Sequence, residues 1–111
     1  MIAIKIDGVE ISEAVIRTEQ MELRVLEMGT DRITFEVKAV YGESFNFVPR
    51  FFRFVYADGS SVAARDQDTR VVQAHETIQS TVVFEEKLRF EAGMKIEIRY
   101  GMYRLADVTV E

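Results

Sequence analysis

The sequence contains no cysteine, which excludes disulfide bonds, cysteine-ligated zinc, thiol catalysis and a lipid anchor on cysteine. His75 is the only histidine, so a zinc site built from several histidines is excluded as well. No apolar run approaches the roughly 18 residues that a membrane-spanning helix requires, and we expect no membrane insertion. The 14 Lys and Arg residues are outnumbered by 19 Asp and Glu residues, which leaves a formal net charge of −5. Nucleic acid is therefore not an expected partner, because contacts to phosphate need clustered basic side chains.

The N-terminal residues lack the basic region followed by an apolar stretch that marks a signal peptide. We therefore expect a cytoplasmic protein if Met1 is the native start, and an extracellular or envelope protein if a leader has been removed. A chain of 111 residues is expected to form one domain spanning residues 1–111. Its composition, 48% hydrophobic and 30% charged, is typical of a globular protein with its own core.

The most informative stretch runs from Phe45 to Val62 and is rich in phenylalanine. From Phe52 onward, aromatic residues alternate with others up to Tyr56, which predicts a half-buried strand. Asp58-Gly59 follows, and this pair is a strong hairpin signal because glycine accepts a positive φ. We expect the hairpin to lie at the centre of the core, with Phe54 almost fully buried.

Other alternating segments predict further strands, with turn signals between them. These segments are residues 2–6, 9–11, 32–41, 71–72, 78–85, 95–100 and 105–110. The first two are expected to form an opening hairpin around Asp7-Gly8, and alternation over residues 32–41 places Tyr41 on the same inward face as Phe35. Residues 12–28 allow two interpretations, because a helix could begin at Ser12 and end before Gly29. The alternation of residues 21, 23 and 25 favours a strand over residues 20–28. Pro49, the only proline, cannot donate to a ladder and predicts an edge or a crossing between sheets.

Short alternating strands with turns every 8–12 residues predict an all-β fold, specifically an antiparallel two-sheet immunoglobulin-like sandwich. Two alternatives stay open. One is a small Greek-key barrel. The other is an α+β fold, which would follow if residues 12–28 formed a helix.

Three segments together resemble a known family. They are the alternating strand Ile33–Val37, the Phe-rich strand and Asp-Gly hairpin Phe52–Gly59, and the Val82-Val83-Phe84 strand end after the turn at Gln73–Thr77. The pattern is similar to immunoglobulin-like domains of unknown function in bacterial envelope proteins and lipoproteins. Those domains carry Pro-Gly where this chain has Ala74-His75. The resemblance implies a sandwich fold and a binding or accessory role, and it supplies no catalytic residues.

Candidate catalytic and metal-binding residues are sparse. A triad of His75, Ser80 and Asp66 is conceivable, but nothing in the sequence brings the three together. Asp66-Gln67-Asp68 offers carboxylates for Ca²⁺, yet the segment lacks the glycine and distal glutamate of a calcium loop. The acidic residues Glu85, Glu86 and Glu91 fit exposed turns better than a glycosidase pair. We therefore predict no enzyme, no metal and no cofactor.

The segment from Arg99 to Arg104 is the candidate partner site. Arg99, Tyr100, Tyr103 and Arg104 bracket Gly101-Met102, and Tyr and Arg are enriched at protein interfaces. The competing interpretation is a hairpin whose tyrosines belong to the core. The rings of residues 45, 47 and 51 are expected in the core first and at a ligand surface second.

These observations predict a non-enzymatic protein–protein interaction or accessory module with an unidentified protein partner. One alternative is a sandwich that binds carbohydrate or another small ligand through the aromatic residues Phe45–Phe51. Another is a small acidic inhibitor of a host protein, encoded by a phage or another mobile element.

Overall fold

The computed structural model describes residues 3–100 and 102–111, apart from the side chains of Tyr100 and Met102. That part of the chain is all-β, without an α-helix, and every strand pairing in it is antiparallel. The strands are β1 (Ile4–Ile6), β2 (Val9–Glu10), β3 (Val15–Arg17), β4 (Met21–Met28), β5 (Arg32–Ala39), β6 (Phe45–Phe47), β7 (Phe52–Val55), β8 (Ser61–Ala63), β9 (Arg70–Val72), β10 (Thr77–Val83), β11 (Lys95–Tyr100) and β12 (Met102–Val110). Two single 3-10 turns, η1 (Ile11–Glu13) and η2 (Pro49–Phe51), complete the regular structure.

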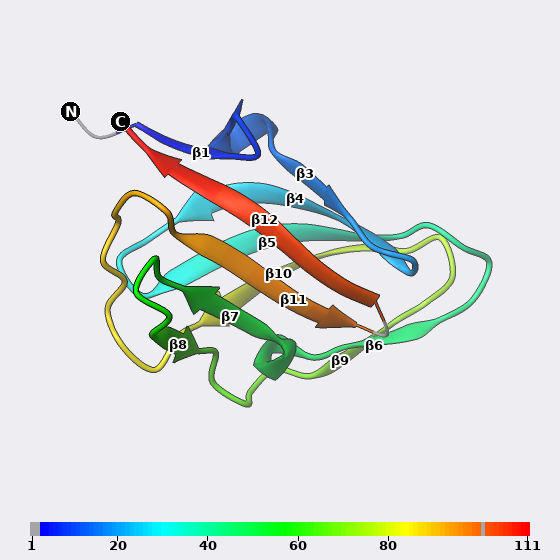
Figure 1. The fold of residues 1–111 in the computed structure, drawn as a ribbon. Coiled ribbons are helices and arrows are strands. Elements are labelled where there is room, and N and C mark those ends of the chain that lie inside the picture. Colours follow the sequence, from blue (N-terminus) through cyan, green and yellow to red (C-terminus); the bar gives the residue numbers. More distant parts are fainter. Residues whose placement is uncertain (1–2, 101) are drawn as a thin grey trace.

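The strands form two large sheets that face one another and one small sheet at an end of the molecule (Figure 1). The six-stranded sheet has the order β2-β1-β12-β11-β7-β8, and the four-stranded sheet has the order β10-β5-β4-β3. Strands β6 and β9 pair separately. None of the three sheets closes into a barrel within the described residues, so the barrel alternative is wrong.

The core lies between the two large sheets and is built from the inward residues of each alternating strand. The ring of Phe35 in β5 stacks on the ring of Phe52 in β7, with their centroids 5.2 Å apart, and so joins the two sheets. Phe54 is fully buried, as predicted, and its ring meets that of Phe84 edge to face at 4.8 Å. The aromatic strand β7 therefore lies at the centre of the core.

The predicted hairpin after β7 is confirmed, since β7 pairs with β8 across the turn that contains Asp58 and Gly59. Gly59 has a φ of +90°, a value that disfavours any residue with a Cβ. The Asp58 carboxylate accepts hydrogen bonds from the Ser60 backbone N–H at 2.8 Å and from its hydroxyl at 2.6 Å. These bonds fix the turn locally.

Residues 12–28 contain strands β3 and β4 and the end of η1 but no α-helix, so the helix alternative and the α+β fold that depends on it are wrong. The predicted strand over residues 20–28 is β4, and its residues Met21, Leu23 and Val25 are all buried. The inward positions recur with a period of two, which places them on one side of a strand but spreads them around a helix. The short strand β3 pairs with β4, and η1 leads into it.

Three further predictions have clear outcomes. Pro49 begins η2, the turn that carries the chain from the small sheet at β6 to the six-stranded sheet at β7, so the predicted crossing is confirmed. The strand predicted to reach Tyr41 ends at Ala39, and the Tyr41 side chain is 61% exposed, so its predicted inward position is wrong. The opening hairpin is present as β1 and β2, with Ile2 outside the described residues.

Candidate functional site

The structure brings Arg99 and Tyr103 together on the outer face of the six-stranded sheet. They are direct partners in the register of β11 and β12. The Arg99 guanidinium carbon lies 5.9 Å from the centre of the Tyr103 ring, within the range of a cation–π contact. The Tyr103 side chain is 58% exposed although it sits on a strand. Tyr and Arg are among the residue types enriched at protein interfaces.

Glu97 lies beneath this pair and is the one charged side chain that the described residues bury. It faces outward, because Ile96 and Ile98 on either side of it face the core, and only 6% of the residue is exposed. Its carboxylate accepts a hydrogen bond from Arg99 Nε at 2.5 Å and another from the Tyr103 hydroxyl at 3.1 Å. A buried carboxylate is stable only when it has such partners, so Glu97 holds both side chains in place.

The Tyr103 phenol keeps its proton in this arrangement. Loss of contact with water and the hydrogen bond to the Glu97 carboxylate both raise the pKa of Tyr103, while Arg99 lowers it by a smaller amount. The hydroxyl is thus a donor at neutral pH, which matches its role toward Glu97.

Arg104 lies elsewhere. It pairs with the core-facing Ile98 in the register, on the opposite side of the sheet from Arg99. Its guanidinium donates to the Asp7 carboxylate and, at 3.1 Å, to the backbone carbonyl of Leu105. The Tyr100 side chain is outside the described part of the chain, as is Gly101, while the strands run up to Gly101 from both sides. Two of the four predicted site residues therefore share a surface.

Sequence reasoning did not select Glu97. A glutamate between two isoleucines in an alternating strand is the pattern of an exposed position, and here neighbouring side chains cover it. The available signal was the spacing of Glu97 and Arg99, because residues two apart on a strand lie on the same face. The part played by Tyr103 required the register, which places it opposite Arg99.

The conceivable triad is not assembled. Ser80 is buried, and its hydroxyl has no hydrogen-bond partner among the described residues. His75 is exposed in the turn before β10, with a φ of +63°. Asp66 instead faces Arg50, with a carboxylate oxygen 3.7 Å from the guanidinium. Across residues 3–100 and 102–111, no group of three or more His, Asp or Glu side chains gathers where it could hold a metal ion.

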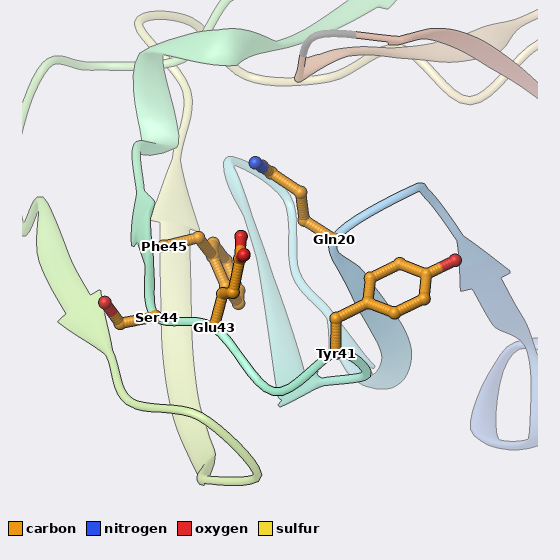
Figure 2. Close-up of a pocket in the computed structure, with 5 residues that line it drawn as sticks. All are labelled: Gln20, Tyr41, Glu43, Ser44 and Phe45. Atoms are coloured by element: carbon orange, nitrogen blue, oxygen red, sulfur yellow. The ribbon is translucent and has the colours of Figure 1, made fainter.

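A small pocket opens at one end of the molecule, as Figure 2 shows. Gln20, Tyr41, Glu43, Ser44 and Phe45 line it, and its volume is about 40 Å³. That volume accommodates a few water molecules but no sugar ring. Of the rings suggested for ligand stacking, Phe45 and Phe47 are buried in the core. The third of these rings, Phe51, is partly buried and lies against the Arg50 guanidinium.

A shallow depression of about 190 Å³ lies on the outer face of the four-stranded sheet, lined by Val15 and four charged residues. Those charges alternate in sign across the strands, with Glu22 opposite Lys38 and Arg24 opposite Glu36. Opposite charges at facing positions stabilise a sheet, so these residues are accounted for as the solvent-exposed face of the four-stranded sheet.

The structure is thus an all-β domain in which Glu97 holds Arg99 and Tyr103 on the outer face of the six-stranded sheet. No protein-family model, curated protein or solved structure matches the chain. Within the described residues, no helix has the length and apolar character needed to cross a membrane.

Proposed function

We propose that the chain is a non-enzymatic protein-interaction module, folded as an immunoglobulin-like sandwich, that binds a protein partner through Arg99 and Tyr103. The observation that carries the proposal is the buried Glu97 carboxylate, which holds both side chains on the outer face of the sheet. Holding an interface residue in its bound geometry before binding reduces the entropy lost on association.

The chemistry of the pair fits a protein surface. Tyr and Arg are the residue types in which binding energy concentrates, and a tyrosine presents a large rigid area with only two side-chain torsions. The Tyr103 hydroxyl and the Arg99 guanidinium are both engaged with Glu97, and Arg99 lies over one face of the Tyr103 ring. The exposed part of the ring and the remaining guanidinium N–H groups are left for a partner.

The test compares two exposed tyrosines. The partner is captured from a lysate of the source organism, purified, and titrated against the wild type, Tyr103→Ala and Tyr41→Ala by calorimetry. Tyr41 is the matched control, because it is as exposed as Tyr103 and follows β5 of the four-stranded sheet, whereas Tyr103 is on β12 of the six-stranded sheet. We expect Tyr103→Ala to lose about 30-fold in affinity with its melting temperature retained, and Tyr41→Ala to bind normally.

Tyr103→Phe refines the result, because it keeps the ring and removes the hydrogen bond to Glu97. Its affinity should lie between those of the wild type and Tyr103→Ala. Equal affinities for Tyr103→Ala and the wild type would refute the site. A loss of affinity matched by a loss of folding would assign Tyr103 to the structure of the domain.

A further inference from the structure

One edge of strand β12 is unpaired over part of its length. Strand β1 covers β12 only from Val110 to Asp107, where the Asp7 N–H donates to the Asp107 carbonyl at 2.7 Å, and the chain then turns away (Figure 1). The Val108 N–H points to β11, where it bonds Met94. By alternation, the N–H and C=O groups of Tyr103 and Leu105 point away from β11, toward the open edge. No described strand pairs with them there.

Arg104 occupies this edge. Its guanidinium donates to the Leu105 carbonyl, one of the edge acceptors, and is held on its other side by the Asp7 carboxylate. A charged side chain over an open edge normally discourages pairing with another strand. Arg104 can leave the Leu105 carbonyl, because a carboxylate on an incoming strand can replace Asp7 as the partner of the Arg104 guanidinium.

We propose that the edge of β12 at Tyr103–Leu105 accepts an extended peptide strand that carries an acidic side chain directed to Arg104. The inference rests on the proposed function, since the same strand presents Tyr103 to the partner. Backbone hydrogen bonds to Tyr103 and Leu105 supply affinity in this mode, and the alternate side chains of the peptide supply specificity. Its outward side chains lie beside Tyr103 and Leu105, and the acidic one lies on the face of Arg104.

A second copy of this chain is the less suitable occupant. Two β12 edges paired around a two-fold axis centred on Arg104 would place the two Arg104 side chains opposite each other, and like charges at facing positions destabilise a sheet. The acidic peptide instead meets a cation at the centre of the edge.

The experiment selects a phage-displayed library of random 12-residue peptides on the full chain. The enriched peptides are synthesised and their affinities measured by fluorescence anisotropy. We expect a Glu or Asp flanked by alternating β-branched or aromatic residues. Arg104→Gln should weaken these peptides about tenfold. Asp7→Asn should tighten them about threefold, because it removes the competing charge and keeps an oxygen for the Asp107 N–H.

Amide hydrogen exchange of the wild type locates the bound strand without any substitution. In the free protein the Tyr103 and Leu105 amides should exchange faster than those of Arg104 and Ala106, which face β11. The peptide should slow exchange at Tyr103 and Leu105 about tenfold or more. Leu105→Pro removes one edge donor and leaves the β11 side intact, and it should abolish peptide binding.

Several results would overturn the proposal. They are failure to enrich any peptide, peptides that bind Arg104→Gln as well as the wild type, and protection at Thr77 and Gln79 on the β10 edge in place of Leu105. If sedimentation velocity shows a dimer, and its formation slows exchange of the Leu105 amide, then the edge binds a second copy of the chain and not a peptide. If the natural partner needs Tyr103 but leaves the Leu105 amide unprotected, the proposed function stands and strand addition fails. If acidic peptides bind the edge while Tyr103→Ala retains the natural partner, the proposed function fails alone.

Discussion

Replacing Phe54 by alanine tests the placement of the core most directly. Phe54 is fully buried at the centre of β7, between Ile96 on β11 and Val62 on β8 in the register. Its ring also meets Phe84 edge to face at 4.8 Å, with 60° between the ring planes. Truncation removes the buried ring and its aromatic contact and leaves a cavity between two sheets whose strands are held by their ladders.

The expected loss is about 3–5 kcal/mol, the range for burying and then deleting a phenylalanine side chain. A domain of this size has about 5–15 kcal/mol of unfolding free energy, so the variant is expected to fold with little margin. For 111 residues, 1 kcal/mol corresponds to about 4 °C in the melting temperature, which predicts a fall of about 12–20 °C. Urea unfolding followed by circular dichroism measures the free energy, and an unchanged slope with denaturant shows that the compactness of both states is kept.

Two further variants make the result interpretable. Phe54→Leu keeps most of the buried volume and should lose clearly less than Phe54→Ala. Tyr41→Ala removes an exposed ring and should change stability by no more than about 0.5 kcal/mol. If Phe54→Ala unfolds at the same urea concentration as Tyr41→Ala, the core lies elsewhere and the central role of β7 is refuted.

Three other changes have defined outcomes. Gly59→Val should lose about 1–3 kcal/mol in thermal unfolding, because a β-branched residue resists a φ of +90°, while Gly59→Asn should lose less; equal losses would contradict the turn geometry. Ser80→Ala should leave stability unchanged or raise it by about 1 kcal/mol in urea titrations, because the buried hydroxyl has no partner among the described residues, and a clear loss would reveal one. The hydrogen bonds from Ser60 lower the pKa of Asp58 below 3.8, so its contribution to stability is present above that pH and is lost as the pH falls through the folded-state pKa. The stability difference between the wild type and Asp58→Asn should therefore shrink as the pH falls below 3.8, and a difference that is the same at every pH would contradict the assignment.

Alternation was sufficient to predict the all-β class and most strands, because a period of two places the same residues in the core whichever strands lie alongside. Phe52 and Phe54 were found in this way. Alternation fails where a strand ends, and the mistaken inward placement of Tyr41 is such a case: the strand stops at Ala39 and the chain turns outward. The order of strands in each sheet could not be predicted, because alternation shows which face a side chain is on but not which strands are hydrogen-bonded to each other.

In the segment Arg99–Arg104, composition indicated which residue types are present, and the strand register determined which of them share a face. Arg99 and Arg104 are five residues apart and chemically identical, and composition placed both in one site. The hairpin register assigns them opposite faces, one above Glu97 and the other against Asp7. Each arginine is therefore hydrogen-bonded to a different carboxylate. Arg99 is held by Glu97 on the outer face of the sheet, and Arg104 covers a backbone carbonyl at the edge.

Glu97 explains why such a site escapes sequence reasoning. A charged residue in an alternating strand is assigned to solvent, and the energetic cost of burying a carboxylate supports that assignment unless partners are present. One partner, Arg99, lies two residues after Glu97 on β11, so alternation already places it on the same face. The other partner, Tyr103, comes from β12 and is identified only once the register places it opposite Arg99. The carboxylate is then buried by the side chains that it binds. The pairing of β11 with β12 is what brings Glu97, Arg99 and Tyr103 together, so the group is recognised from the register and not from any one residue.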